Sequence, residues 1–350
     1  MTALEPLIEI VIPNWNGREL LEKCLLSLRA QTVSSFYVTV VDNGSTDGSC
    51  ELLARTFPEV RLLRFDYNSG FSVAVNHGIE NARAPWLLLL NNDMEVAPDC
   101  LEQLLLAVDR YPECDFFALK MLAFHQRDRL DGAGEAVLRG GVGYRLGTQE
   151  ADREYYRQDR ECFGACAGAA LYSRRFFSLC GLFDPEFFAY LEDVDINFRA
   201  RRLGLGCMYI AGAVVYHIGS ATSGSKINPF TIRLSTRNNL LVLMKNFEAL
   251  LLLRFFPAIV VYQLAWLLFC LKKGMLLPYL HGLREAAPRL SRLFRQGRSF
   301  TEQNRALLPR AQFAALILAA EEEAVASIMA RRAAEGKGNL LLCCYRRLFL

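Results

Sequence analysis

The sequence lacks the features that identify several common classes of protein. Its 350 residues carry a net charge of only +3, and no Lys/Arg block interleaved with aromatic residues occurs in the first two thirds of the chain. We therefore expect no nucleic-acid partner, because such binding relies on a strongly basic surface. The phosphate-binding pattern GxxxxGK[ST] is absent, which disfavours a nucleotidyl- or phosphoryl-transferring protein built on that loop.

The chain also lacks a metal-binding cysteine pattern, and its first residues do not resemble a targeting segment. Among its 11 cysteines, Cys162 and Cys166 are four residues apart without a matching second pair, and Cys343 and Cys344 are adjacent. We expect free thiols in a reducing cytoplasm. The first residues, MTALEPLIEIVIP, contain no basic segment followed by a long apolar core, so we expect no secretory signal.

The first hundred residues alternate between short apolar runs and helical patterns. The runs 8–13, 60–65 and 86–93 are predicted strands, the run 36–45 is a predicted strand that continues into a turn, and the segments 17–31, 48–56 and 72–82 are predicted helices. Continuous apolar strands separated by helices are typical of right-handed βαβ units. We therefore predict an α/β fold with a mostly parallel sheet that is covered on both faces.

Each of the four predicted strands ends in Asn or Asp or is followed by them. These segments are Pro13-Asn14-Trp15-Asn16-Gly17, Asp42-Asn43-Gly44, Asp66-Tyr67-Asn68-Ser69-Gly70 and Asn91-Asn92-Asp93. One such segment alone is typical of a turn. Ligands of parallel sheets, however, bind beyond the carboxyl ends of the strands, and four polar ends at one edge favour a ligand site.

The side chains at this edge suit a nucleoside diphosphate. Asp42 can accept hydrogen bonds from a base or a ribose. Asn16 and Asn68 can hold base, sugar or phosphate, and Gly70 permits close approach of the backbone. A nucleotide is therefore the ligand that we expect at these strand ends.

A divalent cation would neutralise the diphosphate as it departs. Hard oxygen ligands suit Mg²⁺ or Mn²⁺, and Asp93 is the anion at the fourth strand end, whereas Asn91 offers only an amide oxygen or a bridging water. His217 ends the apolar run AGAVVYH and could complete the site begun by Asp93, because Mn²⁺ accepts imidazole. A purely structural histidine is the alternative.

Acidic residues crowd the segment AYLEDVDINFRARRLG. Glu192, Asp193 and Asp195 stand at the start of a predicted helix that also contains three arginines. The structural interpretation is capping, since the helix dipole and nearby arginines favour acids there. The functional interpretation is a general base that deprotonates an acceptor hydroxyl, with the adjacent carboxylate positioning the acceptor. The residues alone leave both open.

The middle of the chain is more irregular. The stretch 131–161, rich in Gly, Arg, Asp and Tyr, is expected to form a loop or a β-excursion over the site. Small residues then precede a predicted helix within 163–177, and the segments 183–204 and 207–224 follow.

Beyond residue 230 the sequence becomes hydrophobic and basic. The segment 249–274 is the most hydrophobic in the chain, and its part 255–271 gives 17 residues, near the short limit for crossing a bilayer. Three interpretations remain open: an interfacial or re-entrant helix, a membrane span, or a buried core helix. The tail includes RRAAEGKGNLLLCCYRRLFL and suits attraction to an anionic membrane, or a solvated helical face.

Six motifs occur in a fixed order along about two thirds of the chain. They are VIPNWNGRELLEKCLLSL, VVDNGSTDGS, YNSGFSVAVNHGI, LLLLNNDMEV, FAYLEDVDINFRARRLG and AVVYHIGS. Each motif is weak alone, but the ordered set resembles the inverting, nucleotide-sugar-dependent glycosyltransferases of family 2. The resemblance implies the GT-A fold, with a Rossmann-like nucleotide-binding half, followed here by a C-terminal helical, membrane-associating extension.

The resemblance also implies roles for the matching residues. Those expected to bind the nucleotide sugar are Pro13, Asn16, Asp42, Asn68, Gly70, Asn91 and Asn92. Asp93 matches the metal-binding aspartate of the family's Asp-X-Asp motif, and His217 matches a histidine that binds the cation in some members. Asp193 matches the catalytic base and Glu192 its acidic neighbour.

Asn91 departs from the family motif, because it replaces the first Asp. This variant is similar to the branch that includes rhamnosyltransferases of cell-surface polysaccharide synthesis, so dTDP-L-rhamnose is the favoured donor and strict dependence on Mg²⁺ or Mn²⁺ is left open. The implied reaction is an in-line displacement with inversion. The alternatives are a UDP-sugar-dependent family 2 transferase of another specificity and a non-catalytic sugar-nucleotide-binding membrane protein.

The expected organisation follows from the resemblance and the change in composition. Residues 1–230 would form the GT-A domain, with 1–98 binding the nucleotide sugar and 99–230 binding the acceptor and carrying catalysis. Residues 231–350 would form a helical region that places the enzyme at the cytoplasmic face of the cell membrane, peripherally, re-entrantly or through a single span. A lipid-linked or glycan acceptor is expected there.

Overall fold

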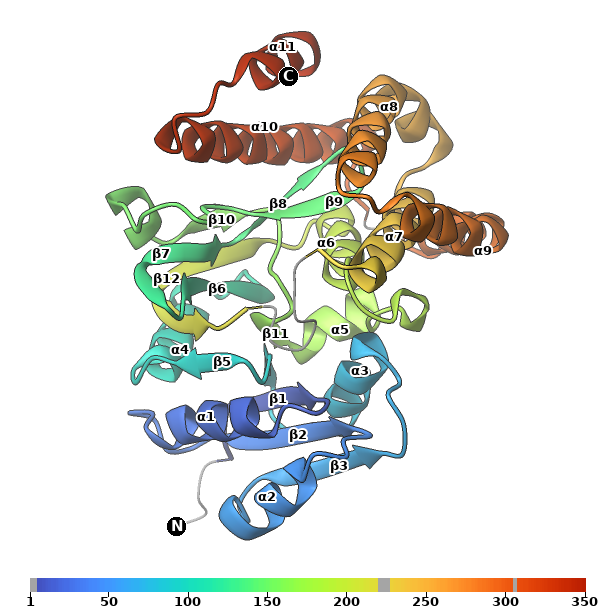
Figure 1. The fold of residues 1–350 in the computed structure, drawn as a ribbon. Coiled ribbons are helices and arrows are strands. Elements are labelled where there is room, and N and C mark those ends of the chain that lie inside the picture. Colours follow the sequence, from blue (N-terminus) through green and yellow to red (C-terminus); the bar gives the residue numbers. More distant parts are fainter. Residues whose placement is uncertain (1–4, 220–226, 305–306) are drawn as a thin grey trace.

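The chain folds around one mixed sheet with helices on both faces, and its last helices gather at the end opposite the first strands (Figure 1). The structure is a computed structural model that describes residues 5–219, 227–304 and 307–350. The predicted segment 207–224 thus lies within the described residues only as far as Gly219.

The first part of the chain alternates strands and helices as predicted. Its elements are β1 (Ile8–Asn14), α1 (Arg18–Arg29), β2 (Tyr37–Asn43), α2 (Ser49–Thr56), β3 (Arg61–Phe65), α3 (Phe71–Asn81) and β4 (Trp86–Leu90). The predicted boundaries need two corrections. Pro13 does not stop β1, which continues to Asn14, and β4 ends at Leu90, so that the Asn91–Asp93 segment is a turn.

The middle part adds short strands and helices. They are β5 (Met94–Val96), α4 (Cys100–Arg110), β6 (Phe116–Ala123), β7 (Gln126–Ala133), β8 (Glu135–Leu138), β9 (Val142–Arg145), β10 (Arg160–Cys162), β11 (Ala169–Ser173), α5 (Arg174–Cys180), α6 (Glu192–Arg202) and β12 (Cys207–His217). Single 3₁₀ turns occur at Glu154–Arg157 and Pro185–Phe187. The stretch 131–161 is therefore a β-excursion, one of its two predicted forms.

Parallel pairing dominates the main path of the sheet. The strands β3, β2, β1 and β4 lie side by side in parallel, and so do β6 and β12, whereas β11 is antiparallel between β4 and β6. The strands β5 and β10 pair with β12, and β7 pairs with β6, each antiparallel. The register aligns Asn14 with Asp42. The polar strand ends therefore meet at one edge, as predicted.

Side chains of the central strands alternate between two core clusters, because successive residues of a strand point to opposite faces. On β1, Ile10 and Ile12 belong to the cluster that contains Leu21 of α1. Val11 belongs to the cluster that contains Ala74 of α3. Helices thus cover both faces of the sheet, as expected for an α/β fold.

The C-terminal helices are α7 (Pro229–Asn246), α8 (Ala249–Lys272), α9 (Leu276–Gln303), α10 (Arg310–Ala334) and α11 (Leu340–Phe349). A third core cluster joins them to the sheet-bearing part, with Val137 of β8, Phe198 of α6, Leu241 of α7, Phe255 of α8 and Phe313 of α10. The hydrophobic core is therefore continuous across residue 230.

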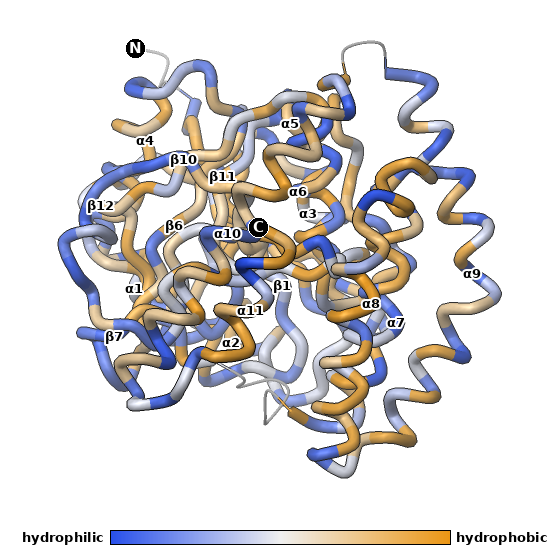
Figure 2. Tube along the Cα trace, turned by 90° about the horizontal axis from the view of Figure 1, so that it is seen from above, coloured by the Kyte–Doolittle hydropathy of each residue, from blue (hydrophilic) through white to orange (hydrophobic). Residues whose placement is uncertain are grey.

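Helix α8 is exposed over most of its length. Among the described residues it is the one helix that is long and apolar enough to cross a membrane, with a mean hydropathy of 1.8. Only 17% of its most apolar 18-residue stretch is buried. Figure 2 shows it in largely hydrophobic colours. Its interpretation as a buried core helix is therefore wrong. The side chains of Leu253 and Leu268 are 71% and 64% exposed.

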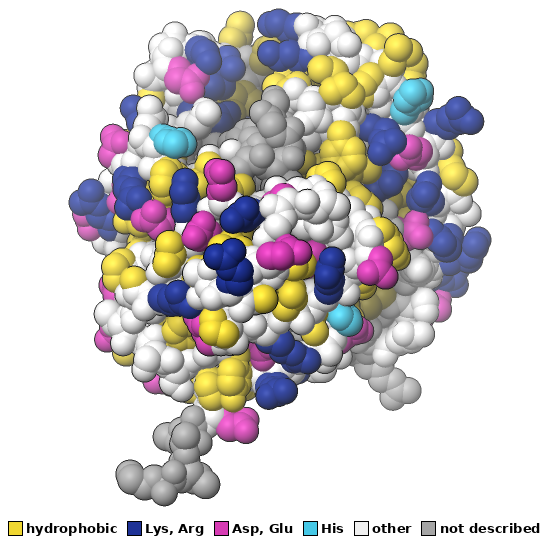
Figure 3. Space-filling view, turned by 60° about the horizontal axis from the view of Figure 1, so that its bottom comes forward, with side chains coloured by type: hydrophobic (Ala, Val, Ile, Leu, Met, Phe, Trp, Pro, Cys, Tyr) yellow, Lys and Arg dark blue, Asp and Glu magenta, His cyan; other side chains and the backbone are white. Residues whose placement is uncertain are grey.

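Charged side chains are dispersed over the face seen in Figure 3, where Lys and Arg alternate with Asp and Glu. This distribution fits the small net charge of +3. On that face no single sign of charge dominates.

Candidate active site

Asn14 ties three strand ends together at the carboxyl edge of the sheet. Its Nδ2 donates to Oδ2 of Asp42 at 3.1 Å and to Oγ of Ser45 at 3.2 Å. Its Oδ1 accepts from Nδ2 of Asn92 at 2.7 Å. The sequence analysis did not assign a role to Asn14, and the only local signal was an Asn at the end of an apolar strand.

Asp42 is wholly buried, with an exposed fraction of 0%. Its Oδ1 accepts from the backbone N–H of Ser45 at 3.0 Å, in addition to the bond from Asn14 to Oδ2. In this structure the carboxylate holds the turn after β2. Pro13 is half-buried beside it in β1.

Asn16 connects the loops that follow β1 and β2, and it is exposed at the edge of the sheet. Its φ of 49° is left-handed, and its backbone N–H donates to Oγ of Ser45 at 2.9 Å. Its Oδ1 accepts from the backbone N–H of Thr46 at 2.8 Å. These bonds place an exposed amide at the mouth of the predicted nucleoside site.

Asn68 and Gly70 belong to the loop between β3 and α3, which is held by hydrogen bonds from Asn43. Asn43 donates from Nδ2 to Oδ1 of Asn68 at 3.0 Å and to the carbonyl of Gly70 at 3.2 Å. Gly70 has φ +89°, and a Cβ there would lie 2.6 Å from the ring of Phe188. The close approach that we expected from a nucleotide is thus made by Phe188, which explains why glycine is required.

His217 brings two aspartates together at the end of β12. Its Nε2 lies 3.3 Å from Oδ2 of Asp93, and its Nδ1 lies 2.6 Å from Oδ2 of Asp131. Burial alone would lower the pKa of His217, but the hydrogen bonds with Asp131 and Asp93 outweigh it and raise the pKa. Asp131 was not predicted as a site residue, because its partner lies 86 residues away in the sequence.

This arrangement fits a divalent cation. Oδ1 of Asp93 is buried without a hydrogen-bond partner, and a carboxylate behind a histidine is the usual way to orient a metal-binding imidazole. No group of three or more His, Cys, Asp or Glu that could hold a metal occurs in the described part of the chain. Asp93 and His217 are therefore two candidate ligands, which is enough for Mg²⁺ because this ion commonly takes only one or two ligands from the protein and the others from substrate phosphates and water.

The three acids at the start of α6 have different surroundings. Asp195 is 0% exposed and binds Nη2 of Arg199 at 2.8 Å, Nζ of Lys245 at 2.9 Å and Nδ2 of Asn246 at 2.9 Å. Burial would raise the pKa of Asp195, but Lys245 and Arg199 lower it to about 2. Its role is the structural one that the sequence analysis gave as an alternative for this cluster.

Asp193 is half-buried and points at the loop that precedes β11. Its Oδ1 accepts from the backbone N–H of Val194 at 2.9 Å, and its Oδ2 accepts from that of Ala167 at 3.4 Å. Burial raises the pKa of Asp193, although these N–H bonds oppose the rise. Glu192 is buried with Oε2 unpaired, and burial together with the charge of Asp193 raises its pKa well above the ordinary value.

Residues 167 and 168 join this acid to the end of β4. The backbone N–H of Ala167 donates to Asp193, and the carbonyl of Gly168 accepts from the backbone N–H of Asn91 at 2.8 Å. A Cβ on Gly168 would lie 2.9 Å from Nδ2 of Asn91. Asp193 and the Asn91–Asp93 turn are therefore close in space, although they are about a hundred residues apart in the sequence.

Glu135 is a buried acid of this site that the sequence analysis did not identify. It lies opposite Arg145 in the β8–β9 pair and accepts from Nδ2 of Asn197 at 2.7 Å. Burial and the charge of Asp193 raise its pKa well above the ordinary value. Asn197 is one helical turn beyond Asp193 and also binds the backbone of Ala165, so α6 holds the loop 164–167 at two points.

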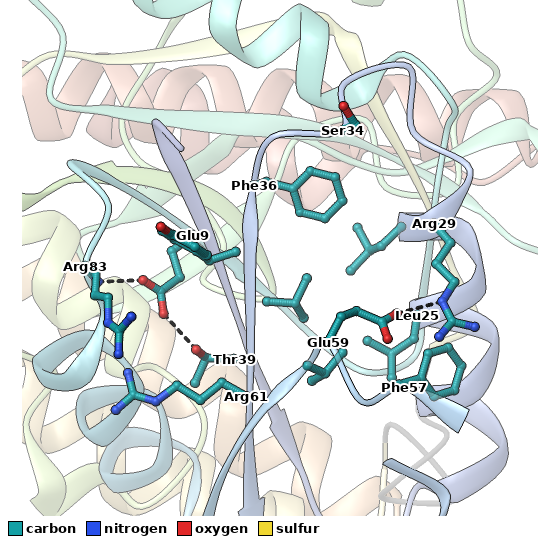
Figure 4. A pocket seen from close by; sticks show the side chains of 14 residues that line it. Glu9, Leu25, Arg29, Ser34, Phe36, Thr39, Phe57, Glu59, Arg61 and Arg83 are labelled. Carbon is teal, nitrogen blue, oxygen red and sulfur yellow. Dashed lines mark hydrogen bonds and ion pairs between the residues drawn. The ribbon is translucent and has the colours of Figure 1, made fainter. Parts of the chain in front are cut away.

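A separate hollow of about 540 Å³ lies at the amino ends of β1, β2 and β3 (Figure 4). Its acids are already paired, because Glu9 accepts from Thr39 and from the backbone of Arg83, and Glu59 pairs with Arg29. It lies at the edge opposite the polar strand ends and contains none of the predicted site residues.

A family model and the named relatives that match the chain are all glycosyltransferases. The family model described as "Glycosyl transferase family 2" matches residues 9–179. The chain is 31% identical over 227 residues to an N-acetylglucosaminyl-diphospho-decaprenol L-rhamnosyltransferase of Mycobacterium tuberculosis. The matched region covers 58% of this chain and 73% of that protein. The chain is 26% identical over 198 residues to a PGL/p-HBAD biosynthesis glycosyltransferase of Mycobacterium bovis, with 55% and 69% covered.

One solved structure that resembles the chain is the 1–349 fragment of TarS from S. aureus. The two chains are 14% identical, the TM-score is 0.48, and the likeness covers 94% of this chain and 92% of the fragment.

Proposed function

The chain belongs to glycosyl transferase family 2, and from this premise we propose that it transfers L-rhamnose from dTDP-L-rhamnose to a hydroxyl of a lipid-linked or glycan acceptor, with inversion. It is a glycosyltransferase by family and by its named relatives. The rhamnosyl donor and the lipid-linked acceptor are proposed because the relative of 31% identity is a decaprenol-linked L-rhamnosyltransferase.

We propose that the polar edge of the sheet binds the donor. Pro13, Asn16, Asp42, Asn68 and Gly70 would shape the nucleoside pocket, Asp42 and Gly70 by fixing its loops. Asn91 and Asn92 would border the diphosphate, and Asp93 with His217 would hold Mg²⁺ or Mn²⁺. When bound, the cation supplies positive charge to the departing diphosphate.

Asp193 is the proposed general base. Its carboxylate accepts the proton of the acceptor hydroxyl while that oxygen forms a bond to the anomeric carbon, and the bond from this carbon to the diphosphate oxygen breaks on the opposite face. The raised pKa of Asp193 suits this role, because a more basic carboxylate takes a proton more readily. Glu192 would position the acceptor beside it.

The observation that carries the proposal is the link through residues 167 and 168. This link brings the carboxylate of Asp193 within one loop of the Asn91–Asp93 turn, where the donor diphosphate would lie. Acceptor and donor would then meet between α6 and the end of β4.

We further propose that residues 231–350 hold the enzyme on the cytoplasmic face of a membrane, with α8 lying in the interface. One side of α8 is tied to the protein, since Nε1 of Trp266 donates to Oγ1 of Thr236 at 2.9 Å, and the ring of Tyr262 packs against Gly140. The opposite side presents exposed leucines next to Lys272 and Lys273. A helix with one protein-bound side and one apolar side suits the interface better than a span.

The test of the base is Asp193→Asn, which keeps the size of the side chain but cannot accept the proton. We expect transfer to fall by about 10²–10⁴-fold, while donor binding, measured as protection against thermal unfolding across a panel of nucleotide sugars, is retained. Turnover close to that of the wild type would contradict the assignment. Protection against thermal unfolding by UDP-sugars rather than by dTDP-L-rhamnose would contradict the proposed identity of the donor.

A further inference from the structure

The segment immediately before the acidic pair has an unusual backbone. Phe188, Tyr190 and Leu191 have φ values of 63°, 70° and 66°, all in the left-handed region that residues other than glycine rarely adopt. Such conformations persist only where the surrounding structure imposes them, and they concentrate at functional sites. Here they set the direction in which α6 begins, at Glu192.

Two buried side chains of α7 hold this segment: Arg237 donates from Nη2 to the carbonyl of Phe187 at 2.7 Å, and Asn238 makes most of the contacts. Nδ2 of Asn238 donates to the carbonyls of Phe187 at 3.0 Å, Ala189 at 2.9 Å and Tyr190 at 2.6 Å. Its Oδ1 accepts from Nε of Arg237 at 2.8 Å, which fixes the orientation of the amide. Asn238 is 0% exposed, so water does not replace these bonds.

The same segment also touches the donor side of the site. The carbonyl of Phe188 accepts from the backbone N–H of Ser72 at 3.2 Å, and the ring of Phe188 occupies the space beside Gly70. The segment 187–191 therefore lies between the loop expected to bind the nucleotide and the expected base. Its conformation fixes the position of one relative to the other.

We propose that Asn238 is a positioning residue for sugar transfer, whose amide holds the left-handed segment 188–191 so that Asp193 faces the acceptor. This inference rests on the proposed function of Asp193. It assigns a part in the reaction to α7, which belongs to the region that sequence analysis placed in the membrane-associating extension. Asparagine suits the position because its NH₂ group supplies two hydrogens to a cluster of carbonyl oxygens, whereas aspartate would bring lone pairs against them.

Asn239 provides a matched control. It is adjacent to Asn238 and only 2% exposed, and both ends of its amide are bonded, since its Nδ2 donates to the carbonyl of Gly140 and its Oδ1 accepts from Nε2 of Gln263 at 2.5 Å. These hydrogen bonds do not involve segment 187–191. The variants Asn238→Ala and Asn239→Ala thus remove the same group, from the same helix, at the same depth.

The experiment compares both variants, as full-length protein in detergent, with a water-soluble acceptor. We expect Asn238→Ala to lower kcat by about 10²-fold, because misplacement of a catalytic group by about 1 Å has an effect of that size. The KM for the donor should change little. Asn239→Ala should reduce the melting temperature similarly but keep kcat within a few-fold of the wild type. Asn238→Ser, which retains one donor, should lie between Asn238→Ala and the wild type.

Several outcomes would overturn the inference. Equal kcat for Asn238→Ala and Asn239→Ala would do so, as would a loss confined to the KM for the donor. If Asn238→Ala and Asn238→Ser both fail to fold while Asn239→Ala folds, Asn238 serves folding rather than positioning. The proposed base is tested separately, because turnover by Asp193→Asn would contradict that assignment whatever Asn238 does.

Discussion

The residues of the Asn91–Asp93 turn have distinct uses, which explains why a motif with two amides can serve the site. Asn92 donates to Oδ1 of Asn14, a bond that an ionised aspartate could not make. Asn91 packs against Gly168, next to the loop that binds Asp193. Only Asp93 presents an unpaired carboxylate oxygen. The negative charge is therefore kept at the one position that faces His217.

Asp131 gives a test of the proposed cation site that leaves both ligands in place. Replacement by Asn weakens the bond to Nδ1 of His217 and so its orientation toward a cation. Loss of such an outer partner commonly costs 10–100-fold in metal affinity, and we expect Asp131→Asn to need about that much more Mn²⁺ or Mg²⁺ for half-maximal activity. Activity is measured against metal concentration.

The control for this prediction is Asp128→Asn, which changes an exposed carboxylate on the same strand. It should leave the metal requirement unchanged. Asp131 also pairs with Arg145, so the melting temperature of Asp131→Asn must be followed. An unchanged metal response in a folded Asp131→Asn protein would show that His217 does not depend on this partner.

Asp195 should make stability depend on pH. Its folded-state pKa of about 2 lies below the ordinary 3.8, so the fold favours the ionised form. This stabilisation is fully present above the ordinary pKa and is lost as pH falls toward the folded pKa. Its size at neutral pH is roughly 2 kcal/mol, since one pKa unit corresponds to about 1.4 kcal/mol.

We therefore expect Asp195→Asn to lower the free energy of unfolding by at least about 2 kcal/mol at pH 7, and by clearly less at pH 3. Denaturant unfolding at the two pH values measures the difference. Asp109→Asn, at an exposed position of α4, should have little effect at either pH. A loss that is the same at pH 7 and pH 3 would show that Asp195 acts through packing rather than through its charge.

At the scale of elements, the sequence predicted what depends on local pattern. The apolar strands and the amphipathic helices of the first hundred residues repeat every two or about 3.6 residues, so their order and parallel pairing could be inferred. The polar strand ends were found for the same reason, since each begins where an apolar run stops. The composition of 131–161 indicated a loop or a β-excursion, and the structure shows the β-excursion.

What could not be predicted depends on contacts between distant segments. Asp131 meets His217 across 86 residues, and Asn197 meets Glu135 across 62. The hydrogen bonds from Asn238 to the carbonyls of residues 187–190 join positions about 50 residues apart in the sequence. No periodicity encodes such pairs, because each partner alone resembles an ordinary polar residue of a helix or a strand. The strand-end pattern, the acidic segment and the resemblance to a family together pointed to Asp93, Asp193 and His217, but not to the residues that orient them.

The exposed side of α8 gives a prediction about membrane binding. Leu253 and Leu264 are 71% and 55% exposed, and burial of a leucine contributes about 1.5–3 kcal/mol. We expect Leu253→Asp and Leu264→Asp each to weaken binding to vesicles with anionic lipid by roughly ten-fold or more. Co-sedimentation with such vesicles measures this.

The matched control is Leu106→Asp on α4, where the leucine is 47% exposed but lies far from α8 along the chain. It should bind vesicles like the wild type. Extraction of membranes with alkaline carbonate separates the two remaining interpretations of α8, because a helix lying in the interface should be released and a span should be retained. Normal binding by both α8 variants would contradict the membrane-facing side proposed here.

At the scale of the whole molecule, the C-terminal helices complete the fold. The hairpin formed by β8 and β9 begins at Glu135, beside the acidic pair, and its tip is held by the C-terminal region. Arg139 forms a buried ion pair with Glu321 of α10 and donates to the carbonyl of Phe349 at 3.1 Å. The change in composition near residue 230 thus does not mark a point at which the chain could be cut.

A chain that ends at residue 245 should therefore fail to fold. It would lose Phe255, Phe313, Ala314 and Ile317 from the third core cluster and leave Val137 and Phe198 facing water. Burial of each large apolar side chain contributes about 1.5–3 kcal/mol, so the sum approaches the whole stability of a typical domain, about 5–15 kcal/mol. We expect insoluble protein, or a soluble form without a cooperative thermal transition. A chain that ends at residue 335 should melt cooperatively, because α11 contains no buried residue and the ion pair of Arg139 with Glu321 is kept although its bond to Phe349 is lost. If both truncated chains melt cooperatively, α8 to α10 are an appendage after all, and α7 alone would suffice to hold the segment before Asp193.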